Sequence, residues 1–133
     1  MTFRYTVSLQ VKHPEYGPES IVTAIGLPAV RSWSVGEERT TPKGTLLQGR
    51  YRESYCVFDL GDGDDGELAD FLRKILINLE HAASFIKELR QTGGKFNFYV
   101  QWTVGERGEV FDIDLLSEMA RIGIDLGIEP LVP

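Results

Sequence analysis

A group of basic and aromatic side chains between residues 31 and 52 is the part of the sequence best suited to chemistry. A guanidinium offers several hydrogen-bond donors in one plane and stacks on rings, so arginine and exposed aromatics are typical of anion recognition and binding hot spots. The alternative is a solvated hairpin whose long side chains shield the sheet. We predict that a ligand or partner binds to Arg31, Trp33, Lys43, Arg50 and Arg52, with Arg39 and Tyr51 beside them.

One thiol and two imidazoles are the candidates for nucleophilic catalysis or metal binding. Cys56 with His13 or His81 would supply a nucleophile and a base. Cys56, however, lies within an alternating apolar pattern, where a small buried cysteine is ordinary, and no nucleophile-elbow motif surrounds it. The histidines are far apart in the sequence and have no ligand motif, and His81 falls in a predicted helix. We therefore predict no catalytic residue, no metal site and no cofactor.

The acidic stretch over residues 61–66 resembles a calcium loop in composition alone. An EF-hand loop that began at Asp62 would need a ligand at its fifth position and a glutamate at its twelfth, where Gly66 and Arg73 stand. We expect a solvated loop in which Asp64 and Glu67 form a capping box for the next helix. No glycine-rich phosphate loop is present, and the spacing of the acidic residues singles out no pair for acid–base catalysis.

The charges are distributed unevenly along the chain. Residues 1–52 hold 7 basic and 4 acidic side chains, whereas residues 53–133 hold 7 basic and 16 acidic ones, for a formal net charge of −6. Phosphate contacts need clustered lysine and arginine, so we do not expect nucleic acid as a partner. The uneven distribution instead suits a protein partner that is steered by charge.

Size and composition predict one folded domain. The chain has 133 residues, of which 42% are hydrophobic and 26% charged, so we assign residues 1–133 to a single domain. A single cysteine excludes an internal disulfide, and the N-terminus lacks the pattern of a signal peptide. No stretch approaches the roughly 18 apolar residues of a membrane span, so we expect a cytoplasmic protein that has no membrane partner.

Alternating apolar residues predict the strands that position these side chains. The pattern indicates strands over residues 3–11, beginning at Phe3, and over residues 51–60, 95–104 and 124–128. Both faces of the 51–60 strand are partly apolar, which favours a central place in the sheet. A short strand is expected at Arg31–Val35, and Thr41–Gly44 has the pattern of a type I turn. Residues 29–50 are therefore expected to form either a hairpin or a long ordered loop.

Apolar residues at spacings of three and four predict helices. The strongest pattern indicates one continuous helix from about Glu67 to Gln91, which would be about 37 Å long at 1.5 Å per residue. Shorter helices are expected from Pro18 to a glycine cap at Gly26, and from a cap at Asp114 to Gly123.

This order of elements predicts an α+β fold. Strands with one apolar face and interspersed helices indicate a two-layer sandwich, with a mainly antiparallel sheet and helices on one face. The first six elements suit a ferredoxin-like arrangement that carries a C-terminal extension. If the other face is open, Tyr99 and Gln101 would join the surface formed by residues 31–52.

Several short motifs also resemble a known family. The motifs are Ile25-Gly26-Leu27-Pro28, then Arg31 to Gly36-Glu37, the aromatic strand Phe96 to Trp102, and the late Ile122-Gly123-Ile124. In their order and spacing they are similar to a bacterial family catalogued as domain of unknown function 4279. The central strand of that family carries a tryptophan, whereas Tyr55 and Val57 stand here. The resemblance implies a fold and a bacterial source, and it implies no reaction.

Two classes of function follow from these observations. We expect a non-enzymatic binding or protein-interaction module, for which an immunity protein that neutralises a toxin is an analogy. The alternative is a protein or enzyme that binds a small anionic ligand between residues 31–52 and the open sheet face. An enclosed pocket around Arg31, Trp33 and Arg50 would favour the ligand, and a flat or convex surface would favour the partner. The oligomeric state is not indicated by the sequence.

Overall fold

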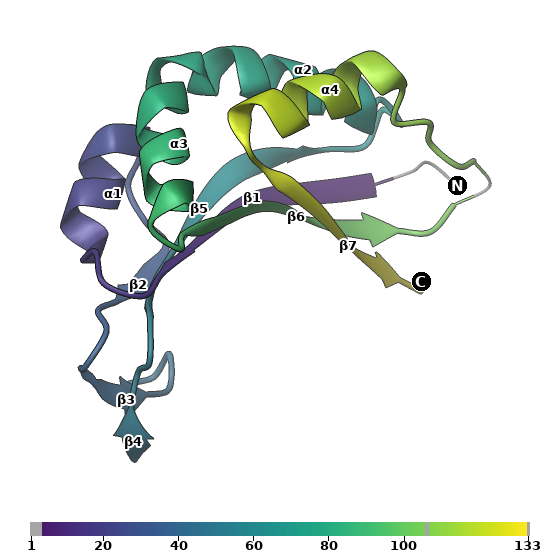
Figure 1. Ribbon diagram of the computed structural model, residues 1–133. Helices are drawn as coiled ribbons and strands as arrows, with labels where there is room; N and C mark the ends of the chain where they lie inside the picture. Colours follow the sequence, from purple (N-terminus) through teal and green to yellow (C-terminus); the bar gives the residue numbers. More distant parts are fainter. Residues whose placement is uncertain (1–3, 106, 133) are drawn as a thin grey trace.

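The computed structural model describes residues 4–105 and 107–132, and a layer of helices covers one face of a curved sheet (Figure 1). Phe3 lies outside the described residues. The helices are α1 (Pro18–Ile25), α2 (Leu68–Leu79), the 3₁₀ turn η1 (Glu80–Ala82), α3 (Ala83–Gln91) and α4 (Ile113–Ile122). The strands are β1 (Arg4–His13), β2 (Arg31–Trp33), β3 (Glu38–Thr40), β4 (Leu46–Arg50), β5 (Ser54–Gly63), β6 (Lys95–Thr103) and β7 (Asp125–Leu131).

The main sheet has five strands in the order β2-β5-β1-β6-β7. Every neighbouring pair is antiparallel except β6 and β7, which are parallel. The elements from β1 to β6, without the β3–β4 hairpin, therefore follow the ferredoxin-like order, and α4 with β7 forms the C-terminal extension. The predicted two-layer α+β sandwich is confirmed, and β5 lies inside the sheet as expected.

The core lies between the sheet and the helices. Alternation along β1 buries Tyr5, Val7, Leu9 and Val11 on the face that the helices cover. The side chains between them form part of the opposite face, which none of the helices in the described residues covers (Figure 1). This uncovered surface is called the open face below.

The helix predicted over residues 67–91 is interrupted, and the prediction of one continuous helix is wrong. It breaks at η1, after which α3 runs in a different direction from α2 (Figure 1). The ring nitrogens of His81 lie 2.8 Å from the carbonyl oxygen of Asn78 and 3.2 Å from that of Ile25. The first contact occupies a carbonyl that a regular helix would use, and the second ties the break to the end of α1. Two shorter helices follow the curved sheet where one straight helix would leave it.

Two predicted helix caps are also wrong. The Asp64–Glu67 capping box does not form, because Asp65 accepts the backbone N–H of Glu67 at 3.0 Å instead. The first turn of α2 is completed from a distant segment, since the Glu109 carboxylate accepts the N–H of Ala69 at 3.2 Å. A pattern confined to the four residues from Asp64 to Glu67 could not reveal this long-range partner.

At the ends of α1 and α4, the glycine caps were predicted correctly, whereas the aspartate cap of α4 was predicted at the wrong residue. The N-cap of α4 is Asp112 and not Asp114, and its carboxylate accepts the N–H of Leu115 at 2.9 Å. Gly26 and Gly123 end α1 and α4 as predicted, with φ angles of 79° and 98° that favour glycine. The last strand continues beyond its predicted end, through Pro130, which an edge strand tolerates.

The segment before β5 forms a hairpin, which resolves the alternative left open by the sequence. β3 and β4 pair in a separate two-stranded sheet that projects away from the helical layer (Figure 1). The predicted turn closes it, and the N–H of Gly44 donates to the carbonyl of Thr41 at 2.9 Å. We call the segment from Glu38 to Arg52 the hairpin arm.

Candidate functional site

A stack of aromatic rings lies where the hairpin arm meets the main sheet. The ring of Trp33, on the edge strand β2, lies 4.3 Å from the ring of Tyr51 and 4.5 Å from that of Tyr55, with small interplanar angles. The guanidinium of Arg31 lies 5.0 Å from the centre of the Trp33 ring. Cross-strand pairs of β2 and β5 bring Trp33 beside Tyr55 on the open face. The stack therefore fixes the arm to the sheet.

Thr40 connects the arm to the same stack. Its carbonyl accepts hydrogen bonds from the Arg31 guanidinium at 2.9 Å and from the Tyr51 hydroxyl at 3.1 Å, and its N–H donates to that hydroxyl at 3.1 Å. The backbone hydrogen bond with Thr40 lowers the pKa of Tyr51, and burial raises the pKa of Tyr55. Arg31 and Tyr51 thus hold the arm at a fixed position relative to β2.

We call the contacts among Arg31, Trp33, Thr40 and Tyr51 the root of the arm. Beyond this root the arm is exposed along its length. Every residue of β4 is exposed, including Leu46 at 67% and Leu47 at 43% of their possible surface. The guanidinium of Arg50 donates to the carbonyl of Gly36 at 2.8 Å, which bends its charge back onto the root. Lys43 stands in the turn and Arg52 follows β4, and both are exposed.

The five predicted binding residues are not gathered into one cavity. Arg31 and Trp33 lie together at the root, where the guanidinium of Arg31 lies over the Trp33 ring. Arg50 lines a shallow depression of about 290 Å³ on the arm, beside Leu46 and Leu47. Lys43 and Arg52 lie at separate exposed positions. The arrangement is a projecting surface and not an enclosed site.

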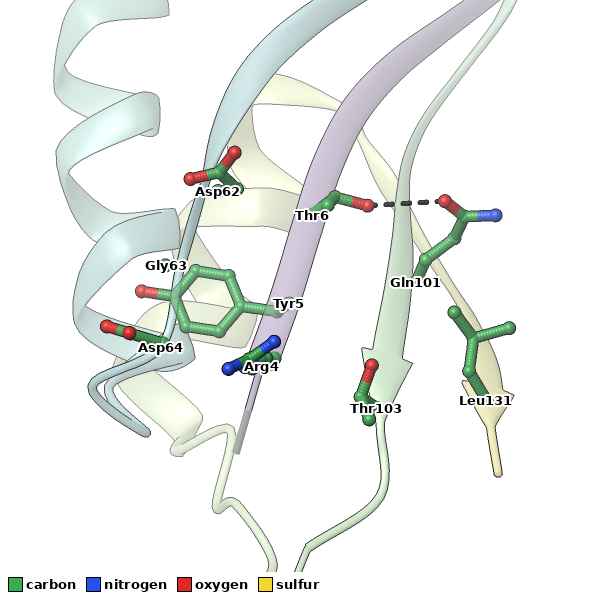
Figure 2. A pocket seen from close by; sticks show the side chains of 9 residues that line it. All are labelled: Arg4, Tyr5, Thr6, Asp62, Gly63, Asp64, Gln101, Thr103 and Leu131. Carbon is green, nitrogen blue, oxygen red and sulfur yellow. Dashed lines mark hydrogen bonds between the residues drawn. The ribbon is translucent and has the colours of Figure 1, made fainter. Parts of the chain in front are cut away.

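A polar hollow of about 460 Å³ lies at the opposite end of the open face from the arm (Figures 1 and 2). Arg4 and Thr6 of β1 line it, and Gln101 of β6 lies beside Thr6. The Thr6 hydroxyl donates a hydrogen bond to the amide oxygen of Gln101 at 3.3 Å. Asp62 and Asp64 stand on the other side of Arg4 (Figure 2). The sequence assigned Gln101 to the open face, and it drew attention to Asp62 and Asp64 only as members of an acidic loop. The polar alternation of β1 and β6 was the only signal of the hollow, and the pairing of the strands had to be known to combine them.

The residues considered for nucleophilic catalysis have structural contacts. Cys56 is fully buried under the helices, and burial raises the pKa of its thiol to about 11. His13 is also fully buried, and its Nδ1 accepts the backbone N–H groups of Glu15 and Tyr16, both at 2.9 Å. Its Nε2 lies 2.8 Å from the hydroxyl of Thr92. Both residues are therefore placed for packing and backbone organisation and lie away from the open face.

The described residues contain neither a metal-binding cluster nor a membrane-spanning helix. Among them, no group of histidine, cysteine and acidic side chains has an arrangement that could hold a metal ion. No helix in the described ranges combines the length and apolar character needed to cross a membrane.

Comparisons with known proteins do not assign the chain. No protein-family model matches it, and neither the curated proteins nor the solved structures include a match. The resemblance to the bacterial family therefore stays a prediction.

Proposed function

We propose that this chain is a non-enzymatic protein-interaction module, and that the hairpin arm is the surface that binds its partner. The observation that carries the proposal is a hairpin exposed along its length but held rigidly at its root by Arg31, Trp33 and Tyr51. A rigid arm loses little conformational entropy when it binds, which increases affinity. An acidic patch with an apolar centre is the surface that would complement its cations and exposed leucines.

The shape of the surface supports a protein partner over a small ligand. A small-molecule site is usually concave and covers most of its ligand. The depression beside Arg50 is shallow and separate from Arg31 and Trp33. The Trp33 ring already packs against the Tyr51 ring and the Arg31 guanidinium. An immunity protein that neutralises a toxin by binding it is one class of protein that would use such an arm.

Lys43 and Arg52 are the residues to change in a test. Reversing Arg31 or Arg50 would also remove hydrogen bonds to Thr40 or Gly36 and so disturb the arm itself. Lys43→Glu with Arg52→Glu reverses two exposed charges on the arm, and Lys87→Glu with Lys95→Glu makes the same change in net charge elsewhere.

The experiment is a quantitative pull-down from the native cells, with wild type and both double variants as immobilised protein. We expect a protein that wild type and the Lys87/Lys95 control retain and that the arm variant loses. The purified partner should bind the arm variant at least about tenfold more weakly. Equal retention of every captured protein by the two double variants would remove the arm from consideration.

A second candidate is a small ligand in the polar hollow, which has an unenclosed shape but several hydrogen-bonding groups. Arg4 is suited to an anion, whereas Asp62 and Asp64 beside it oppose one. A thermal-shift screen against carboxylates and phosphates tests this candidate. Stabilisation that Arg4→Ala abolishes would support it, and no shift with any compound would count against it.

A further inference from the structure

A largely apolar groove lies between α2 and α4. Both helices belong to the layer that covers the sheet on the side opposite the open face (Figure 1). The groove has a volume of about 430 Å³. Leu76 and Leu115, which are buried, form its floor, and Ile77 forms part of its wall with 74% of its surface exposed. A contiguous apolar hollow that is rimmed by polar side chains is a common feature of docking sites.

Two ion-pair bridges frame the groove. Arg73 of α2 pairs with Asp112 at the start of α4, and Arg121 of α4 pairs with Glu80 just after α2 at 2.5 Å. Arg73 and Glu80 are seven positions apart, which corresponds to about 10 Å of helix. These bridges link the two helices at either end of the groove, and the groove is present in the unbound chain.

The rim of the groove is acidic. Both arginines have two carboxylate partners, because Arg73 also pairs with Asp70 and Arg121 also pairs with Glu118. Asp114 lines the groove in addition. The carboxylates around the groove thus outnumber the cations and would attract a basic segment.

We propose that this groove docks a basic amphipathic helix of a partner protein. Apolar side chains of that helix would contact Leu76, Ile77 and Leu115, and its lysines or arginines would lie near Asp114 and Glu118. About 10 Å accommodates side chains one helical turn apart, which is the spacing such a helix presents. The site is independent of the hairpin arm, since it lies on another layer and has the opposite charge.

The test uses a synthetic amphipathic peptide of leucine and lysine as the probe, with a leucine–glutamate peptide of the same pattern as its counterpart. Labelling the isoleucine methyl groups allows both isoleucines of interest to be observed in one NMR spectrum. We expect the lysine peptide to shift the methyl signal of Ile77 and to leave that of Ile113 unchanged. Ile113 is similarly exposed, at 77%, but does not line the groove.

Matched variants test the same site by binding affinity. Ile77→Lys with Asp114→Lys should weaken the lysine peptide at least about tenfold. Ile113→Lys with Asp125→Lys makes the same change in net charge outside the groove and should have little effect. Thermal melting of both variants checks that each remains folded. If one variant is unfolded, the methyl shifts of Ile77 and Ile113 in the wild type decide whether the peptide binds in the groove.

Three results would overturn the proposal. Equal weakening by both double variants would show a general attraction between charges. Equal binding of the leucine–glutamate peptide would show that the acidic rim selects nothing. A dimer in sedimentation that Ile77→Lys converts to monomer would show that the groove is occupied by a second copy of the chain.

Discussion

Individual residues of the predicted binding surface have two different roles. Arg31 and Trp33 have the residue types of a hot spot, but their contacts with Thr40 and Tyr51 hold the hairpin arm in place. Lys43 and Arg52 are the cations that remain available on the exposed part of the arm. The same residue types therefore build the support and the surface, and only the contacts distinguish them.

His13 leads to a prediction about pH. Burial lowers its pKa from the ordinary value of 6.5, although the Glu15 carboxylate offsets part of that effect. The unfolded chain therefore binds the proton more readily than the folded one. The stability that His13 contributes is present above about pH 6.5 and is lost as the pH falls through the lowered pKa. Protonation of Nδ1 would also remove its two backbone hydrogen bonds.

The variant His13→Asn tests this prediction. The asparagine amide can still accept a backbone N–H, but it does not titrate, so the free energy of unfolding should change less between pH 7.5 and 5.5. We expect a cost of about 2 kcal/mol at pH 7.5 because the ring contacts and the Thr92 hydrogen bond are lost. Urea unfolding at several pH values measures both effects. A variant with the wild-type pH dependence would contradict the assignment to His13.

At the scale of elements, patterns confined to one strand or one turn were predictable. Alternation located β1, β5 and β6, and the glycines after α1 and α4 marked their ends, because these signals depend on the backbone of their own segment. The break at η1 was not predictable, since it depends on the contact between His81 and Ile25, far apart in the sequence. The polar hollow escaped prediction for the same reason: it requires the pairing of β1 with both neighbours.

The hairpin arm should be dispensable for folding. The N–H of Tyr51 donates to the carbonyl of Glu37, so an Asn-Gly turn placed between these two residues can replace residues 38–50. The removed strands are almost entirely exposed, and we expect the free energy of unfolding to fall by about 1 kcal/mol or less. Urea unfolding measures it. A loss above about 3 kcal/mol would show that the arm belongs to the folding unit.

At the scale of the whole molecule, the fold separates three surfaces of different chemistry. The helical layer presents the acidic groove, the open face presents polar side chains, and the basic arm projects from the edge at β2 (Figure 1). The net charge of −6 hides this separation. A partner with both a basic helix and an acidic patch could engage groove and arm together, which would raise its affinity by effective concentration.

The C-terminal extension should be required for folding, although the ferredoxin-like order is complete without it. Leu115, Met119, Ile122 and Ile124 are buried in the common core. Each contributes about 2 kcal/mol by burial, so a chain ending at residue 104 would lose about 8 kcal/mol, as much as a typical domain possesses. We expect that chain to lack dispersed amide signals in NMR, whereas a control ending at residue 131 should keep them. A folded 104-residue chain would instead make α4 and β7 an independent addition.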